Sequence, residues 1–240
     1  MEFNKVLSFE LKGRTGHFKK YYSNKNSLSY ILPTRTVLMG MVASILAYPR
    51  DSYYEIFSPK RAKFGLQIVN PVYKHFECMN YLNHKEESHH TQVRLQLILP
   101  KEADNIKYRV YFAHKDNELM DELSAKLKAE KQGFGLFFGQ RQFRATADNL
   151  KVIESPEIID NYAGPLSSLT FKDNIKTIDP SNEIDLIVEN MPVDFQKVDS
   201  GREPTEVAAF CYEENGKKIP GEFNQGIKID DKVISFYTPV

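Results

Sequence analysis

The order in which strand-like and helix-like periods follow one another in the first 140 residues constrains this fold most. Apolar and polar residues alternate over 3–11, which predicts a half-buried strand. Apolar residues then recur with a helical period over 34–47, where Thr34 or Thr36 can cap the first turn. A second amphipathic helix is expected over 117–131, with acidic residues in its first turn and lysines in its last. The chain thus opens with a strand, and two helices interrupt the strands that follow.

Further strands are expected at 64–76, 93–99 and 108–113, and one more after the second helix. The resulting order, β-α-β-β-β-α-β, holds one strand more than the β-α-β-β-α-β unit of a ferredoxin-like (RRM-type) domain. We interpret the additional strand as part of a β-hairpin that projects from the sheet within about 77–113. The sequence therefore predicts an α+β fold, a ferredoxin-like domain with a projecting β-hairpin.

The remainder of the chain has a different character, because short strand candidates alternate there with Pro, Gly and Asn. These candidates lie at 183–188, 207–212, 227–229 and 233–237. We therefore expect two domains. Residues 1–148 form the ferredoxin-like domain, called the palm below, with the hairpin inserted. Residues 149–240 form a smaller β-rich C-terminal region.

Charge is distributed unevenly along a chain whose formal net charge is zero. Residues 1–64 hold eleven Lys and Arg against four Asp and Glu, a net charge of +7. Residues 150–214 hold five against fourteen, a net charge of −9. This asymmetry favours a polyanion as the partner of one face, although two ordinary solvated surfaces would give the same counts.

Membrane, secretory and metal-dependent classes find no support in the sequence. No apolar run approaches the roughly 20 residues of a membrane span, and the N-terminus alternates where a signal peptide would be continuously apolar. Cys78 and Cys211 are too few for a metal cage and are expected to be free thiols in a reducing cytosol. We therefore expect a globular cytoplasmic protein with no membrane contact, no metal and no cofactor.

The segment 12–25 combines cations and aromatic rings at high density. It contains five Lys and Arg, four aromatic or imidazole side chains, and two glycines that let a ligand approach the backbone. Cations contact phosphates and rings stack on bases, so this composition favours binding of single-stranded nucleic acid. The alternative is that the rings belong to the core and the lysines are merely solvated. The residues singled out are Lys12, Arg14, His17, Lys19, Lys20 and Tyr21.

The start of the first predicted helix supplies a second candidate. Arg35 lies in the first turn, where the helix macrodipole disfavours a cation. A phosphate bound by Arg35, by free backbone N–H groups and by the hydroxyls of Thr34 and Thr36 would explain its presence. The alternative is an ion pair between Arg35 and a nearby acid. Gly40 weakens the same helix, which suggests that another group packs closely against it.

The polar stretch 77–91 is the first candidate for the projecting hairpin. Its histidines, His84, His89 and His90, match neither the helical spacing nor the finger spacing of zinc ligands. We therefore interpret this stretch as a flexible projection that touches RNA or a neighbouring subunit.

A third cluster, rich in glycine, spans residues 133–145 and carries Gln140, Arg141 and Arg144 beside Phe143. It lacks the pattern of a dinucleotide-binding or phosphate-binding loop, because no Lys-Ser/Thr follows its glycines. Elsewhere in the sequence, no Ser/His/Asp or Cys/His grouping carries the signature of a catalytic nucleophile.

Two parts of this sequence resemble one known family. Residues 9–20, Phe-Glu-Leu-Lys-Gly-Arg-Thr-Gly-His-Phe-Lys-Lys, and the block 26–46 that follows resemble the N-terminus of CRISPR-associated protein family five. That family belongs to the RAMP superfamily, and its type I-B branch is the most similar. Residues 138–145, Phe-Gly-Gln-Arg-Gln-Phe-Arg-Ala, are similar to the segment that follows the second helix in the same family. The C-terminal third adds nothing specific.

The resemblance implies an RRM-like palm, a projecting thumb hairpin and a smaller C-terminal β region. It also implies a role: the family caps the 5′ handle of the mature CRISPR RNA (crRNA) in the Cascade surveillance complex. There it contacts the backbone subunit and the large subunit, and it meets target DNA only indirectly. The RNA-binding residues would be Lys12, Arg14, His17, Lys19, Lys20, Tyr21, Asn24, Thr34, Arg35, Thr36, Gln140, Arg141 and Arg144. The thumb candidates are Tyr81, His84, Lys85, His89 and His90, with 93–113 as the alternative position of the thumb.

Two other functions stay open. One branch of the family cleaves precursor RNA, and a metal-independent endoribonuclease of that kind would use His17 as general base with Lys19 or Tyr21 as its electrostatic partner. The type I-B likeness argues against it, because a separate endoribonuclease performs that step there. The third hypothesis is a protein-interaction module, which suits the acidic C-terminal region and predicts negligible, salt-insensitive RNA binding.

Overall fold

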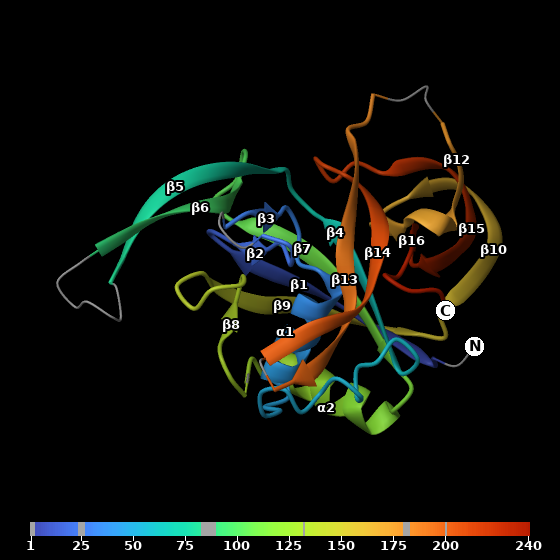
Figure 1. The fold of residues 1–240 in the computed structure, drawn as a ribbon. Helices are drawn as coiled ribbons and strands as arrows, with labels where there is room; N and C mark the ends of the chain where they lie inside the picture. The colour runs from blue at the N-terminus through green and yellow to red at the C-terminus, as the bar shows by residue number, and fades with distance from the viewer. Residues whose placement is uncertain (1–2, 24–26, 83–89, 132, 180–182, 200) are drawn as a thin grey trace.

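The computed structural model describes residues 3–23, 27–82, 90–131, 133–179, 183–199 and 201–240. Its centre is a five-stranded antiparallel sheet with the strand order β4-β7-β1-β9-β8 (Figure 1). The strands are β1 (Lys5–Gly13), β4 (Ala62–Ile68), β7 (Ile106–His114), β8 (Leu136–Phe137) and β9 (Arg144–Glu154). The first strand of the sequence, β1, pairs with β7 on one side and with β9 on the other, so it lies in the middle of the palm.

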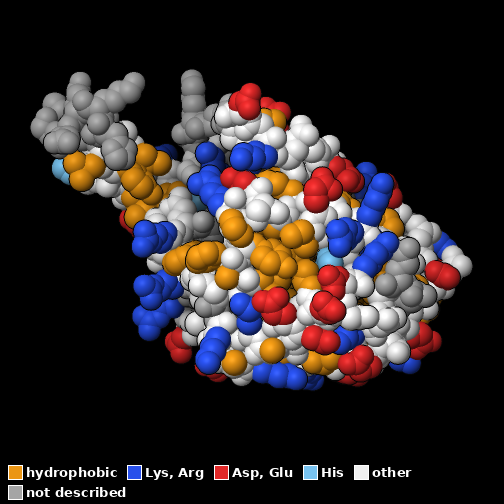
Figure 2. All heavy atoms as spheres, turned by 90° about the horizontal axis from the view of Figure 1, so that it is seen from below, with side chains coloured by type: hydrophobic (Ala, Val, Ile, Leu, Met, Phe, Trp, Pro, Cys, Tyr) orange, Lys and Arg blue, Asp and Glu red, His pale blue; other side chains and the backbone are white. Residues whose placement is uncertain are grey.

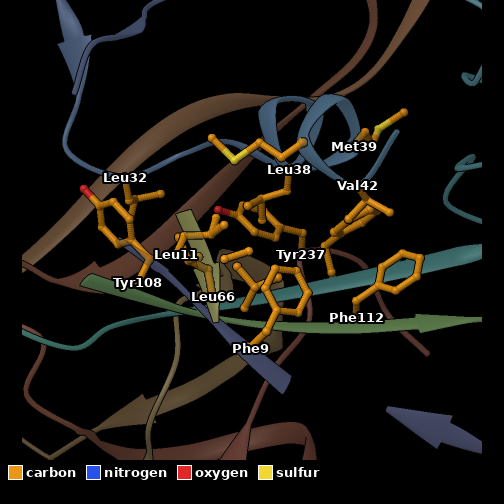
Figure 3. Packing of buried hydrophobic residues seen from close by; sticks show 14 of the residues in the cluster. Phe9, Leu11, Leu32, Leu38, Met39, Val42, Leu66, Tyr108, Phe112 and Tyr237 are labelled. Atoms are coloured by element: carbon orange, nitrogen blue, oxygen red, sulfur yellow. The ribbon is translucent and has the colours of Figure 1, made fainter. Parts of the chain in front are cut away.

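Helices α1 (Arg35–Ile45) and α2 (Asn117–Lys128) pack against one face of this sheet. Thr34 caps α1 through its side chain, and Asp116 caps α2 in the same way. Figure 3 shows Leu38 and Val42 of α1 among apolar side chains that rise from the sheet. These are Phe9, Leu11, Leu66, Tyr108 and Phe112. Each large apolar side chain buried in this way contributes about 1.5–3 kcal/mol relative to exposure.

The projecting hairpin consists of β5 (Val72–Leu82) and β6 (His90–Pro100), which pair as a separate two-stranded antiparallel sheet. It extends away from the body on one side (Figure 1). The predicted boundaries, 77–113, need correction, because the hairpin starts earlier and residues 106–113 belong to β7. The side chains of β7 that face α1 and α2 are fully buried in the palm, which makes this segment a central strand.

Short strands connect β1 to α1 and attach this connection to the hairpin. β2 (Phe18–Lys19) pairs with β3 (Ser29–Tyr30). Next to them, the Gly16 N–H donates to the Ile98 carbonyl at 3.0 Å, and the Ile98 N–H donates back to the Gly16 carbonyl at 2.8 Å. The basic loop therefore lies along the edge of β6, at the base of the hairpin.

The C-terminal part of the chain forms two further sheets. The four-stranded sheet has the order β10-β16-β15-β12, built from β10 (Glu157–Leu166), β12 (Ile175–Ile178), β15 (Ile219–Ile229) and β16 (Lys232–Ile234). The three-stranded sheet has the order β11-β14-β13, built from β11 (Thr170–Phe171), β13 (Leu186–Val198) and β14 (Gly201–Glu213). The 3-10 helix η1 (Lys172–Asn174) follows β11. None of the described helices is long and apolar enough to cross a lipid bilayer.

The predicted division at residue 148 does not coincide with a break in the structure. Residue 148 lies inside β9, so the palm sheet itself continues past it. The palm and the C-terminal sheets also share their apolar cores: Val6 and Ala113 pack with Ile227 and Phe236. The edge of β4 is closed by C-terminal segments as well, since the N–H groups of residues 169 and 237 donate to its carbonyls. The two parts therefore fold as one body.

Candidate nucleic-acid interface

The turn between β8 and β9 (residues 138–143) lies beside the base of the hairpin (Figure 1), and together with Arg144, the first residue of β9, it is called the ridge below. Phe138 anchors the ridge, because its ring is fully buried and contacts the Phe18 ring edge-on at a centroid distance of 5.7 Å. Gly139 has a φ of +91°, and a Cβ there would lie 1.8 Å from the His17 carbonyl oxygen. Only glycine permits this approach, so the ridge is held firmly against the loop that follows β1.

A groove runs along each side of this ridge. The α1 groove has a volume of about 700 Å³ and is lined by residues that include Thr36, Gly40, Tyr53, Arg141, Phe195 and Arg202. The β1 groove has a volume of about 660 Å³ and is lined by residues that include Lys12, Arg14, Asn105, Gln142, Arg144 and Thr146. The two arginines of the ridge therefore line different grooves: Arg141 lines the α1 groove and Arg144 lines the β1 groove.

Arg14, Arg141 and Arg144 are exposed, and none of them has an ion-pair partner in the part of the chain that the structure describes. Lys12 differs, because its Nζ donates to Asp148 Oδ2 at 2.8 Å, and this hydrogen bond raises the pKa of Lys12. Figure 2 shows Lys and Arg side chains along the margin of the body on the side where the hairpin projects. Unpaired guanidinium groups bind phosphates in bidentate geometry, so this margin suits a polyanion.

Asp51 organises the opposite wall of the α1 groove. The Tyr54 hydroxyl donates to Asp51 Oδ1 at 2.5 Å, and the Asp51 carboxylate lies 3.3 Å from Arg50 Nε and 3.6 Å from Arg202 Nε. The hydrogen bond from Tyr54, together with both arginines, lowers the pKa of Asp51, whereas burial and the same hydrogen bond raise the pKa of Tyr54 to about 12. At neutral pH the ionised Asp51 therefore holds two cations at the mouth of the groove.

Arg35 is not available to a phosphate, which corrects the prediction made from its position in the helix. Its side chain is fully buried and its guanidinium donates to three backbone carbonyls, those of Val193, Phe57 and Ala62, at 2.8, 2.6 and 3.2 Å. The alternative ion pair is a loose one, because Asp194 Oδ1 lies 4.0 Å away. Burial lowers the pKa of Arg35 to about 10, so the group remains charged at neutral pH. Arg35 thus joins α1 to β13 and to the turn before β4.

The threonines beside Arg35 have separate roles. Thr34 is buried and accepts a hydrogen bond from the Val37 N–H as the N-cap of α1. Its Oγ1 also lies 2.9 Å from Thr36 Oγ1, within hydrogen-bonding distance. Only Thr36 reaches the α1 groove. The predicted phosphate site at Thr34–Thr36 is therefore reduced to one hydroxyl in the wall of the groove.

Lys20 is a structural cation, in contrast to its exposed neighbours Lys19 and Tyr21. Its Nζ donates to Glu189 of β13, and the second oxygen of Glu189 accepts from the Tyr212 hydroxyl at 2.7 Å. Although burial acts against the charge, the hydrogen bond to Glu189 raises the pKa of Lys20. The loop thus keeps Lys19 and Tyr21 outside and uses Lys20 to attach itself to the C-terminal sheet.

His17 is buried and both of its ring nitrogens have partners. Nδ1 lies 2.8 Å from the Gln96 carbonyl, which can only accept, so Nδ1 carries the proton. Nε2 therefore accepts from the Ser27 hydroxyl at 2.9 Å. Burial lowers the pKa of His17, and the charge of Lys19 lowers it further. The imidazole therefore fixes the loop to β6, and neither ring nitrogen is free for the RNA contact that the sequence predicted.

We expect acidification to loosen this attachment. Because folding lowers the pKa of His17, its contribution to stability is complete above the unfolded value of about 6.5 and is lost as the pH falls through the folded value. Amide hydrogen exchange of Gly16 and Ile98 should accelerate below pH 6.5 by at most about tenfold per pH unit, after correction for the intrinsic rate. A His17→Gln variant should lack this additional acceleration, and equal behaviour of the two proteins would contradict the assignment.

The other residues predicted to bind RNA or to form the thumb are either exposed or lie outside the residues that the structure describes. Asn24, His84, Lys85 and His89 lie outside the described residues. Tyr81 and His90 are exposed on the hairpin, and Gln140 accepts a hydrogen bond from Gln142 on the ridge. Among the described residues, no three His, Cys, Asp or Glu side chains gather as metal ligands.

The structure adds residues that sequence reasoning missed. Arg50, Tyr53 and Tyr54 follow α1 in a turn, and Phe195 and Arg202 come from the β13–β14 ribbon. The dense group of charged and aromatic residues at 50–54 was a usable signal, because it resembles the composition of segment 12–25. No sequence signal pointed to Phe195 and Arg202, because only tertiary packing brings the β13–β14 ribbon to α1.

Comparison with solved structures found proteins of CRISPR systems. A CRISPR protein from Archaeoglobus fulgidus aligns with a TM-score of 0.60 over 95% of this chain and 98% of that one, at 13% sequence identity. A chain of a CRISPR RNA-guided surveillance complex aligns over 89% of this chain and 91% of its own, at 15% identity and a TM-score of 0.48. No protein-family model matches the sequence, and no curated protein matches it. The likeness to the Archaeoglobus protein covers nearly all of both chains and shows that this chain has the same fold.

Proposed function

We propose that this chain is a non-catalytic, RNA-binding subunit of a CRISPR ribonucleoprotein. The observation that carries the proposal is the group of exposed arginines Arg14, Arg141 and Arg144, which have no ion-pair partner among the described residues and lie at a ridge between two grooves. Guanidinium groups bind the phosphates, and grooves leave room for the bases of a single strand. The fold shared with a CRISPR protein from Archaeoglobus fulgidus supports this setting.

The finer role that we propose is the one implied by the sequence resemblance. The chain would be a type I-B member of CRISPR-associated protein family five that caps the 5′ handle of the mature crRNA in Cascade. It would contact the backbone subunit and the large subunit, and it would meet target DNA only through them. The palm supports this role, because β1-α1-β4-β7-α2-β9 follows the β-α-β-β-α-β order of a ferredoxin-like domain.

The endoribonuclease alternative receives no support at His17. A general base needs a free lone pair within reach of the substrate hydroxyl. The only acceptor nitrogen of His17 is occupied by the Ser27 hydroxyl, and the side chain is 2% exposed. We therefore expect labelled repeat RNA to stay intact when incubated with this subunit in EDTA, and cleavage under these conditions would favour the endoribonuclease.

The decisive experiment identifies the RNA that the subunit carries. The chain is expressed with its genomic neighbours, purified through a tag on this subunit, and the bound RNA is sequenced. We expect mature guide RNAs that share one 5′ end, because a cap on the handle fixes that end. The Lys20 and Arg35 positions are unsuitable for mutational tests of RNA binding, since both side chains hold the fold together.

Two results would contradict the proposal. Assembly of the complex without RNA would favour the protein-interaction module. Bound RNA of random sequence with scattered 5′ ends would leave an RNA-binding protein but remove the role as a 5′ cap.

A further inference from the structure

The α1 groove is built by four separate segments that meet around one hollow. These segments are α1 with Gly40, the turn after α1 with Tyr53, the β8–β9 turn with Arg141, and the β13–β14 ribbon with Phe195. A Cβ at Gly40 would approach the Tyr53 hydroxyl to 3.3 Å and meets nothing else within 4 Å. The absence of a side chain at position 40 therefore keeps the groove open between the helix and its walls.

The lining of this groove combines aromatic faces with an excess of positive charge. Its aromatic side chains are Tyr53, Tyr54, Phe137 and Phe195. Its charged side chains are Arg50, Arg141 and Arg202, and no carboxylate belongs to the described lining. Asp51 is close to both Arg50 and Arg202 but carries a single negative charge, so the lining keeps an excess of positive charge. Aromatic faces stack on bases, and excess cations attract the phosphates that accompany them.

The ridge separates this groove from a neighbour of different chemistry. The β1 groove is lined mainly by polar and charged side chains with Phe143, and Arg144 faces it from the ridge. A strand that contacts both Arg141 and Arg144 has to cross the ridge. Bases are splayed apart where a single strand bends in this way, which exposes the face of one base to the aromatic side.

We propose that the α1 groove is a nucleobase pocket that takes one base of the bound RNA, with the adjacent phosphates on Arg141 and Arg202. This inference rests on the proposed function and assigns a specificity-determining site within it. An aromatic side chain of a neighbouring protein would fit the apolar walls equally well. It would leave Arg141 without an anionic partner among the described residues, and one carboxylate, that of Asp51, to balance Arg50 and Arg202, whereas each nucleotide brings its own phosphate.

A Gly40→Met variant tests the pocket without weakening the helix. Methionine has a higher helix propensity than glycine, and its side chain would extend into the open groove. Ala125→Met serves as the matched control, because residue 125 is exposed on α2, outside the groove lining. The probe is a single-stranded RNA of about 12 nucleotides, within the site size of such proteins, and a series in which one base at a time is removed while sugar and phosphate stay.

With the wild-type protein, loss of one particular base is expected to weaken binding about tenfold, the effect of losing one stacked base, and the other positions should respond little. Gly40→Met should bind the intact RNA about tenfold more weakly and should no longer distinguish that position. Ala125→Met should behave like the wild type throughout.

Other results would overturn the inference in distinguishable ways. Full affinity or full position dependence in Gly40→Met would show that the groove holds no base while RNA binding itself stands. Release of a neighbouring subunit by Gly40→Met, with RNA affinity unchanged, would assign the groove to a protein partner. Absence of any salt-dependent RNA binding by the wild-type protein would remove the proposed function and the pocket together.

Discussion

Replacing Arg35 with alanine is expected to lower the free energy of unfolding by about 3–5 kcal/mol. The guanidinium donates to the carbonyls of Val193, Phe57 and Ala62, and the side chain is fully buried, so water cannot readily replace it. Each buried carbonyl left without a donor costs about 1–3 kcal/mol, and the cavity left by the side chain adds to the loss. The effect should be global, because this residue connects α1, β13 and the turn before β4.

Urea unfolding followed by circular dichroism measures this effect directly. Arg50→Ala is the control, since Arg50 is an exposed arginine in the turn that follows α1, and its loss should change stability by less than about 0.5 kcal/mol. If Arg35→Ala unfolds like the wild type but binds RNA less tightly, the phosphate-binding interpretation drawn from the sequence would be restored. If both stability and RNA affinity are unchanged, neither role is correct.

The sequence predicted a phosphate as the partner of Arg35, whereas the structure gives it backbone carbonyls. The position of a cation in a helix therefore does not by itself identify the group that it binds. The macrodipole argument required a negative group near the first turn, and such groups are indeed present, as the carbonyls of Phe57, Ala62 and Val193. Two of them follow α1 closely in sequence, but Val193 is 158 residues away. Sequence patterns cannot distinguish a phosphate from carbonyls that tertiary folding brings to the same place.

The palm elements could be predicted because the apolar residues that pack in the main core recur with the period of each element. Leu7, Phe9 and Leu11 of β1 do so, as do the buried residues of both helices, although the other face of β1 is buried as well. The hairpin boundary could not be found in this way. Leu95 and Ile98 of β6 are buried like residues of a palm strand, because the loop around Gly16 and Ser27 bridges to them. Alternation of apolar and polar residues indicates that one face of a strand is buried, but it does not identify the segment that packs on that face.

The basic loop illustrates the same limit for the candidate site. Its composition indicated a nucleic-acid interface, and Arg14, Lys19 and Tyr21 are exposed as that interpretation requires. Lys20 and His17 point into the protein, where they attach the loop to β13 and to β6. A cation in a basic segment can serve the fold or the ligand, and the choice depends on whether a carboxylate from a distant strand reaches it.

Replacing Arg14, Arg141 and Arg144 with alanine together is expected to weaken binding of single-stranded RNA roughly 100-fold at low salt, at about 1 kcal/mol for each lost phosphate contact. The structure supports additivity of this kind, because the three arginines are exposed and have no ion-pair partner among the described residues. Stability should change little for the same reason, so the loss would report on binding. Fluorescence anisotropy with a labelled RNA over a series of salt concentrations is the measurement.

The salt dependence separates specific contacts from general attraction. Each phosphate contact with a single strand contributes about 0.7 to the slope of log K against log salt, so three lost contacts should reduce the slope by about 2. A second triple variant, in which the exposed Lys172, Lys176 and Lys228 are replaced by alanine, removes the same charge from the C-terminal part of the chain. Equal losses in both variants would mean that RNA responds only to net charge. A reduced slope confined to the arginine variant would place the strand on the ridge, since only contacts that displace counterions from the RNA change the slope.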